Sequence, residues 1–346
     1  MQNRKFLHHI PTTVITGFLG AGKTTAINHL LAEKPAGEIW AVLVNEFGQV
    51  GVDGALIGPV SGVAIREIAG GCLCCTAGQA FEAALNRLIR DTSPDRILIE
   101  PTGIGHPLKI IRTLTGGYYK DVLDLRATIC LVDARKLSDA RYREHPAFQD
   151  QLNLSDVLVA SKSDLYSDDD RSAFADLVSG SIPPKTAYTM ISFGKVDSVL
   201  LNLPRDQSRM AGFPDAHPVR EHPFSLDGVQ EVIDIKAAPV SRESWVMHEG
   251  SGEGYYSKSW LIGTGYRFDS TALSVLLTSF PYARIKGIML CNDGWMKING
   301  GEGVVECSVS EPQSNSRLEI IDSAPLLFIE IDRKLKKVLG KESSEF

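Results

Sequence analysis

Residues 17–24 read GFLGAGKT, a short loop with glycines at both ends that leads into Lys23 and Thr24. Glycines let backbone N–H groups turn onto phosphate oxygens, the lysine reaches the β and γ oxygens, and the threonine hydroxyl suits Mg²⁺. The alternative is a glycine-rich turn without a ligand, but this loop follows an apolar run and opens a helical pattern, as a nucleotide site requires. The predicted nucleotide ligands are Gly17, Gly20, Ala21, Gly22, Lys23, Thr24 and Thr25.

Three of the six cysteines fall within four positions, as Cys72, Cys74 and Cys75. Thiolates favour Zn²⁺, Cu(I) or iron–sulfur chemistry. A three-thiolate set with an open or oxygen-filled fourth position suits a transferable Zn²⁺ better than a closed structural site does. Glu46 is the predicted oxygen ligand of this transition-metal site, and His106 is a further candidate. The alternative is a redox-active pair of Cys72 with Cys74 or Cys75, because a disulfide between two adjacent cysteines is strained.

Glu100 ends a third apolar run and is followed by Pro-Thr-Gly103. A carboxylate at this place can hold Mg²⁺ through water or orient the attacking water, and the Gly103 backbone can approach the γ-phosphate. An ordinary acidic strand end is the alternative. We therefore take Lys23, Glu100 and Gly103 as the candidate catalytic residues, with Thr24 as the Mg²⁺ ligand.

Ser161, Lys162 and Asp164 follow a further apolar run. The acid can accept hydrogen bonds from the ring N–H and amino groups of guanine, while the lysine stem covers the base. Lysine–aspartate pairs also occur in many surface loops, so only the position after a core strand favours GTP over ATP here.

Apolar runs alternate with helical patterns along the first 200 or so residues. The predicted strands are residues 12–16, 39–44, 96–99, 127–132, 157–160 and 187–191, and the clearest helices are 21–33 and 77–90. This alternation predicts an α/β fold with a mostly parallel sheet that is covered on both faces. Ligands bind at the carboxyl ends of such strands, so we expect the loops above, together with Asp133, to meet at one crevice.

With 346 residues, the chain is long enough for two domains. We predict a nucleotide domain over residues 1–202, a linker over 203–218 and a smaller α+β domain over 219–346. In the last part we expect strands at 232–235, 260–268, 285–291, 295–298 and 326–331, helices at 270–278 and 333–339, and a loop at 248–257.

The net charge of −6 does not favour nucleic acid as a partner. No run approaches the length of a membrane span, and the first residues lack a secretory pattern, so we expect a cytoplasmic protein without a membrane partner. Clustered thiols in a reducing compartment favour metal binding over disulfide formation.

Together these residues resemble the CobW-like GTPases, a metallochaperone-type branch of the P-loop NTPases that includes the nickel accessory GTPases HypB and UreG. The likeness is strong over residues 12–200 and weak beyond. It rests on residues 17–25, on 45–48 with Asp53, on Glu67 with 71–75, on 100–103 with Pro107, on 161–164 and on the Arg-x-Lys-Gly element at 284–287.

The resemblance implies a GTPase that binds GTP or GDP with Mg²⁺ and carries Zn²⁺, or Co²⁺ or Ni²⁺, to a client metalloprotein. It makes residues 45–53 the first switch and Cys72–Cys75 the metal motif, and a homodimer is a further expectation. With no assignable arginine finger, we expect slow intrinsic hydrolysis. The family's guanine motif usually begins with asparagine, so Ser161 lacks the amide that braces the loop.

Two rival hypotheses remain. One is an assembly factor that acts mainly through protein binding and holds a structural metal. The other is a thiol-redox-sensing NTPase, which would contain no metal when freshly purified.

Overall fold

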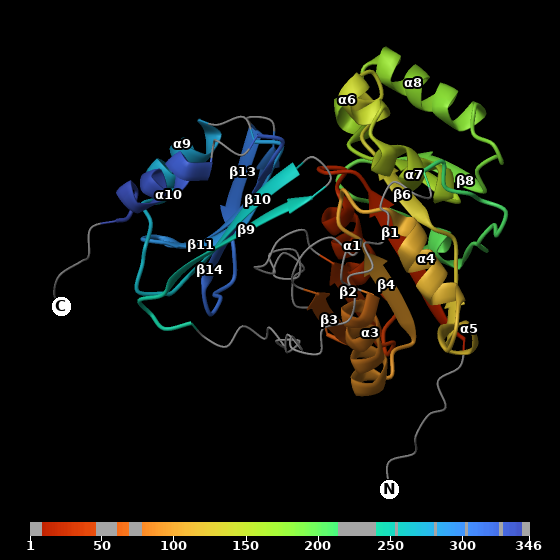
Figure 1. Ribbon diagram of the computed structural model, residues 1–346, viewed down its shortest axis with the longest axis horizontal. Coiled ribbons are helices and arrows are strands. Elements are labelled where there is room, and N and C mark those ends of the chain that lie inside the picture. Colours follow the sequence, from red (N-terminus) through yellow and green to blue (C-terminus); the bar gives the residue numbers. More distant parts are fainter. Residues whose placement is uncertain are drawn as a thin grey trace, which may run out of the picture. The chain divides into compact units, whose positions relative to one another are not determined.

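The computed structural model describes residues 9–45, 61–68, 78–213, 240–252, 255–279, 282–301, 304–324 and 328–340. These residues form two compact units, each built around its own β-sheet (Figure 1). No helix among them has the length and apolar character needed to cross a membrane.

The sheet of the first unit has the order β3-β2-β4-β1-β6-β7-β8, with β5 also paired to β1, and every pairing is parallel. Its strands are β1 (Ile10–Gly17), β2 (Trp40–Asn45), β3 (Val63–Ile68), β4 (Arg96–Glu100), β5 (Leu123–Leu125), β6 (Ile129–Val132), β7 (Val157–Ala160) and β8 (Ala187–Met190). All six predicted strands are confirmed. Two strands were not predicted: β3, where Arg66 and Glu67 interrupt the apolar pattern, and the three-residue β5.

Helices cover both faces of this sheet, which explains why its central strands are almost wholly apolar. The helices are α1 (Lys23–Ala32), α3 (Gly78–Thr92), α4 (Pro107–Thr115), α5 (Tyr119–Val122), α6 (Ala140–Arg143), α7 (Pro146–Leu154) and α8 (Asp168–Ser179), with short 3₁₀ turns η1 (Ala134–Lys136), η2 (Ser163–Leu165) and η3 (Ser198–Asn202). Ile27 and Leu30 of α1 pack in one core with Val42. Phe81 and Leu85 of α3 pack in the other core with Leu43.

The second unit is an antiparallel sheet with two helices, which confirms the predicted α+β class. Its strands are β9 (Trp245–Gly252), β10 (Tyr255–Ile262), β11 (Arg284–Cys291), β12 (Gly294–Gly301), β13 (Val304–Val309) and β14 (Ser316–Asp322), in the order β13-β12-β11-β14-β10-β9. The helices α9 (Ser270–Thr278) and α10 (Phe328–Lys337) pack on one face, where Leu273 and Leu335 share a core with Trp260 (Figure 1).

Local patterns predicted the middle of this unit well. Helix α9 has the predicted bounds, and β11 and β12 pair up to Cys291 and Gly294, so Asn292 and Asp293 form the expected hairpin turn. The Arg-x-Lys-Gly element forms the first four residues of β11.

Three predictions for this unit were wrong. The predicted strand 260–268 is too long, because β10 ends at Ile262 and residues 263–267 lie outside any strand. Residues 328–331 begin α10 rather than forming a strand, because Ile331 and Leu335, four residues apart, are both fully buried against the sheet. Residues 248–252 and 255–257 belong to β9 and β10 rather than to a loop, because pairing between these two strands satisfies their backbone groups despite the glycines. The predicted strand at 232–235 lies outside the described residues.

Residues 203–213 of the predicted linker are held to the first unit. The Arg209 guanidinium donates from Nε to Asp156 Oδ1 at 2.8 Å, with both side chains buried, and also donates to the carbonyls of Pro183 and Pro184 at 3.2 and 2.7 Å. The remaining linker residues, 214–218, lie outside the described part of the chain, so the boundary itself stays a prediction.

Candidate functional site

The loop between β1 and α1 has the backbone shape that its glycines predicted. Gly20 and Gly22 have φ angles of 77° and 86°, in the left-handed region that favours glycine. Gly22 directly precedes the first residue of α1, so the helix N-terminus opens from the loop. An N-terminus of this kind presents free N–H groups and a positive dipole end to an anion.

Lys23 lies between this loop and the loop that follows β4. Its ammonium Nζ donates to the carbonyl oxygens of Gly17 at 2.8 Å and Phe18 at 3.4 Å, and the residue is only 9% exposed. A Cβ added to Gly103 would lie 3.1 Å from this Nζ and 2.8 Å from Leu19 Cδ2. The backbone at Gly103 therefore comes close to Lys23, and only glycine leaves room for that approach. The predicted approach of Gly103 to a γ-phosphate stays a prediction.

Thr24 and Glu100 meet across the two strand ends. The Thr24 hydroxyl donates to Glu100 Oε1 at 3.1 Å, and Glu100 is 1% exposed at the end of β4. A hydroxyl and a carboxylate are the hard oxygen ligands that Mg²⁺ prefers. The two residues therefore fit a Mg²⁺ ion bound beside a nucleotide.

Helix α7 holds the loop after β4, an arrangement that the sequence analysis missed. The Gln151 amide Nε2 donates to the carbonyls of Gly103 and Gly105 at 3.0 and 3.1 Å. Its neighbour Asp150 lies 3.0 Å from His106 Nδ1 and accepts from the backbone N–H of Gly212 at 2.7 Å. These bonds fix the loop that carries Gly103.

His106 was a candidate metal ligand. In the structure it is 8% exposed and its Nδ1 faces the buried Asp150 carboxylate. Among the described residues, no group of three or more His, Cys, Asp or Glu side chains could hold a metal ion.

Ser161 joins the predicted base-reading loop to the phosphate-binding loop. Its hydroxyl donates to the carbonyl of Ala21 at 2.8 Å, and the residue is 3% exposed. The Ser161 hydroxyl therefore braces this loop in place of the side-chain amide that the sequence lacks there.

Lys162 is held beside this brace by an acid from the neighbouring strand end. Its ammonium lies 3.3 Å from Asp133 Oδ2, and Arg135 donates to both oxygens of the same carboxylate at 2.9 and 2.6 Å. Burial works to raise the pKa of Asp133, but the bonds from Arg135 and the charge of Lys162 hold it below its ordinary value. Asp133 therefore stays ionised and anchors the Lys162 ammonium. Asp164 lies in the short turn η2 directly after it.

The loop after β8 is part of the same edge, and the sequence analysis missed it. The Ser192 and Ser163 hydroxyls lie 3.0 Å apart, and the Ser163 N–H donates to the carbonyl of Ile191 at 2.9 Å. A Cβ added to Gly194 would lie 2.9 Å from the carbonyl oxygen of Thr25. The loop thus lies between the base-reading loop and the start of α1. This loop could have been found from the predicted strand 187–191. Ligands bind at the carboxyl ends of parallel strands, and the residues after 191 stand at such an end.

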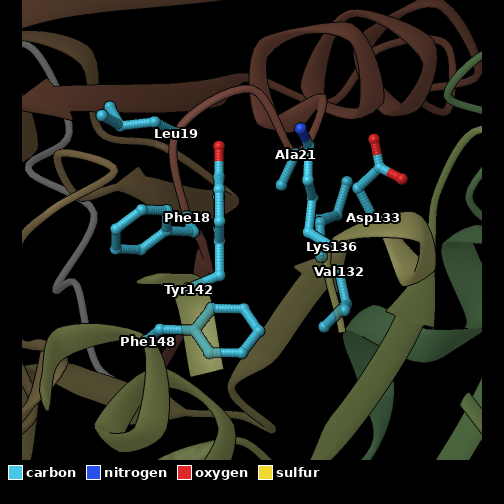
Figure 2. Close-up of a pocket in the computed structure, with 9 residues that line it drawn as sticks. Phe18, Leu19, Ala21, Val132, Asp133, Lys136, Tyr142 and Phe148 are labelled. Carbon is cyan, nitrogen blue, oxygen red and sulfur yellow. The ribbon is translucent and has the colours of Figure 1, made fainter. Parts of the chain in front are cut away.

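Phe18 anchors the phosphate-binding loop in an aromatic cluster. Its ring centroid lies 5.1 Å from that of Tyr142, 4.9 Å from His145 and 5.8 Å from Phe148, all in edge-on geometry. Figure 2 shows Phe18, Tyr142 and Phe148 together at one side of a small pocket, with Asp133 and Lys136 at the other. With Phe18 only 3% exposed, the packing fixes the start of the loop.

The predicted transition-metal ligands Glu46, Cys72, Cys74 and Cys75, as well as Asp53, lie outside the described residues. The strand before the thiol motif, β3, ends at Ile68, and α3 after it begins at Gly78. Because β3 is parallel to β2 and β2 is parallel to β4, β3 ends at the edge of the sheet where Glu100 lies.

Comparison with known proteins gives one family match and several relatives. Residues 11–187 match the family described as CobW/HypB/UreG, nucleotide-binding domain. Zinc chaperone YeiR of Escherichia coli (strain K12) is 39% identical over 318 residues, which cover 90% of this chain and 93% of the relative. Zinc chaperone CobW of Pseudomonas aeruginosa is 35% identical over 184 residues, or 50% of this chain and 49% of the relative.

A crystal structure of the Zn(II)-bound YjiA GTPase from E. coli matches with a TM-score of 0.42 at 22% identity, over 95% of this chain and 99% of that chain.

Proposed function

Since the chain belongs to the CobW/HypB/UreG family, we propose that it is a GTP-hydrolysing chaperone that carries Zn²⁺ to a client metalloprotein. The observation that carries this proposal is the meeting of Lys23, Thr24, Glu100 and Gly103 at one sheet edge, the edge at which β3 ends before the thiol motif. The names of the relatives, which include two zinc chaperones, support zinc as the cargo.

In this proposal Lys23 neutralises the β- and γ-phosphate oxygens, and Thr24 and Glu100 are the residues that would hold Mg²⁺. Bound Mg²⁺ would neutralise the charge that develops on the phosphates during hydrolysis. Glu100 also orients the attacking water, and the Gly103 N–H donates to the γ-phosphate. Gln151 keeps Gly103 in place through its bonds to the loop carbonyls.

The base is selected by the loop that begins at Ser161. Asp164 accepts from the guanine ring N–H and amino groups, and the Lys162 stem covers the base while Asp133 holds its ammonium. The brace from Ser161 to the Ala21 carbonyl ties base recognition to the phosphate-binding loop.

Cargo binding is assigned to Cys72, Cys74 and Cys75, with Glu46 as the oxygen ligand. Three thiolates select Zn²⁺ over Mg²⁺, and an incomplete set of protein thiolates allows transfer. Residues 45–53, which begin at the end of β2, would sense the γ-phosphate and couple hydrolysis to release. Action in the cytoplasm, a client partner and a homodimer are parts of this proposal.

A zinc titration tests the coupling. We expect Zn²⁺ to bind with different affinity when the protein holds a non-hydrolysable GTP analogue and when it holds GDP. Replacing Cys72, Cys74 or Cys75 by serine should weaken zinc binding at least tenfold. Cys307→Ser is the matched control, because Cys307 is exposed in the second unit and should leave the affinity unchanged.

Equal zinc affinity in the two nucleotide states would overturn the coupling and favour an assembly factor with a structural metal. Freshly purified protein without zinc, together with a disulfide at Cys72 that alters turnover, would favour the redox-sensing alternative.

A further inference from the structure

Phe193 combines two features that are uncommon for a large aromatic residue. Its side chain is 73% exposed, and its backbone φ is 55°, in the left-handed region. Bulky residues adopt this conformation at a cost, and such strain persists only where the surrounding structure imposes it and often where it serves function. Exposure alone is not distinctive, since Tyr188 on β8 is 62% exposed with ordinary strand geometry.

The strain at Phe193 has a counterpart at the neighbouring strand end. Among the described residues, four other than glycine have a positive φ: His9, Ser93, Lys162 and Phe193. Lys162 follows β7 and Phe193 follows β8, and these two strands are adjacent and parallel. The two strained residues thus stand at the same edge of the sheet, one in each of the two loops nearest the predicted base site.

The neighbours of Phe193 fix its backbone on both sides. Ser192 contacts the Ser163 hydroxyl at 3.0 Å. Gly194 packs so closely on α1 that an added Cβ would lie 2.8 Å from Thr25 Cγ2. The loop is therefore bonded to the base-reading loop at one residue and packed on the phosphate-binding segment at the other, with Phe193 between them.

We propose that Phe193 is a nucleotide-binding residue whose ring stacks on the guanine base. The proposal rests on the proposed GTP site and adds an aromatic platform to it. Stacking accepts any base because every base has a π face, whereas the hydrogen bonds of Asp164 depend on the base edge. Phe193 therefore contributes affinity, and Asp164 contributes selectivity.

Calorimetric titration of the full chain with GDP and Mg²⁺ tests this division. Phe193→Ala should weaken GDP binding about tenfold or more, and Phe193→Trp should stay within about threefold of the parent, because tryptophan restores a stacking surface. Tyr188→Ala is the matched control, as an exposed aromatic on β8, the strand that precedes the loop of Phe193, and should leave GDP affinity unchanged. Unchanged GDP affinity in Phe193→Ala overturns the proposal.

Phe193→Gly separates a binding role from a structural one. Glycine adopts a positive φ without strain, so this variant should melt no lower than the parent when nucleotide is absent. Its GDP affinity should nevertheless fall as far as that of Phe193→Ala. Parallel losses of melting temperature and affinity would mean that Phe193 acts only by shaping the loop, and would overturn the stacking role.

Asp164→Asn distinguishes failure of this proposal from failure of the guanine site itself. The asparagine amide can donate to the extra carbonyl of xanthine, so this variant should prefer XDP over GDP. Adding Phe193→Ala to it should weaken XDP binding by the same factor that it weakens GDP binding in the parent. Suppose that Asp164→Asn shifts the preference from GDP to XDP, but Phe193→Ala changes neither GDP affinity in the parent nor XDP affinity in Asp164→Asn. Then only the stacking proposal fails. An unshifted preference overturns the guanine site on which it rests.

Discussion

The two sheets of this protein place their polar side chains in different ways. In the first unit every described strand pairing is parallel, so all strand carboxyl ends lie at one edge. At this edge Glu100 ends β4 and accepts from Thr24, and Ser161 follows β7 and donates to the Ala21 carbonyl. In the second unit neighbouring strands are antiparallel, so carboxyl ends alternate between two edges.

The polar residues of the second sheet lie within its strands instead. Lys286 stands opposite Glu319, which stands opposite Ser259, and all three are buried. On the face toward α9 and α10, Asp332 accepts from the indole N–H groups of both Trp245 and Trp260 at 3.0 Å. A parallel sheet thus concentrates polar groups at the edge where a ligand can enter, whereas these described polar groups of the antiparallel sheet lie in its own interior.

Substitution in the second core should show the largest effect, on stability alone. Trp260→Ala removes a fully buried indole and its bond to Asp332, and should lower the free energy of unfolding by about 3–5 kcal/mol. Urea titration followed by circular dichroism measures the loss. GDP affinity should stay at the parent value, because the proposed site lies in the first unit. Tyr256→Ala, at 37% exposure in the same strand, is the control. If Trp260→Ala also weakened GDP binding, the nucleotide site would depend on the core of the second unit, which contradicts the assignment of the site to the first unit.

Substitution at the first sheet's edge should have the reverse effect. Lys23→Ala removes the ammonium proposed to neutralise developing phosphate charge, and should slow GTP hydrolysis by about 100- to 1,000-fold. Its melting temperature should stay close to that of the parent, since the ammonium donates to the loop carbonyls of Gly17 and Phe18 rather than to the core. Lys120→Ala, on the exposed surface of α5, serves as the control. Hydrolysis at the parent rate would contradict the assignment of the site.

The close approach at Gly103 offers a finer probe of the same edge. A methyl group added there would meet Leu19 Cδ2 at 2.8 Å and Lys23 Nζ at 3.1 Å. Gly103→Ala should therefore displace the lysine and lower hydrolysis about tenfold, while GDP affinity falls less. Gly180→Ala, at the end of α8 with an ordinary φ of −81°, is the matched change. If Gly103→Ala and Gly180→Ala changed turnover equally, the close approach of the Gly103 backbone to Lys23 would have no functional role.

The smallest expected effect is a pH dependence in the second unit. Burial works to raise the pKa of Asp332, but bonds from Lys336, Trp260 and Trp245 hold it below its ordinary value. A carboxyl with a depressed folded-state pKa stabilises the fold above its unfolded pKa, and this contribution disappears as the pH falls through the folded value. Asp332→Asn should cost about 1 kcal/mol at neutral pH. The difference in stability from the parent should begin to shrink as the pH falls below about 4, the ordinary carboxyl value, and should vanish below the lowered folded-state pKa.

Glu330→Gln is the control for that series, because Glu330 is exposed on the same helix. If the free energies of unfolding of the parent and Asp332→Asn differed by the same amount at every pH, the ionised state assigned to Asp332 would be wrong.

Much of the fold and part of the site could be predicted because the signals are local. The phosphate-binding loop, helix α9 and the turn at Asn292 and Asp293 each depend on spacing within one element or two neighbouring ones. Glu100 and Ser161 could be placed at the correct edge because strands of a parallel sheet share one direction. The strand β9 and the first part of β10 could not be predicted, because pairing with each other overrides their glycine-rich composition.

The amino-acid sequence indicates which chemical groups this protein carries and at which strand ends they stand. Folding brings particular groups together that no sequence pattern pairs: Gln151 with Gly103, 48 residues away, and Ser161 with Ala21, 140 residues away. These contacts depend on the lateral order β4-β1-β6-β7 of the sheet and on where α7 packs. Residue periodicity records which face of a strand is buried but not which strand lies beside it, so contacts across the sheet edge arise only when the chain has folded.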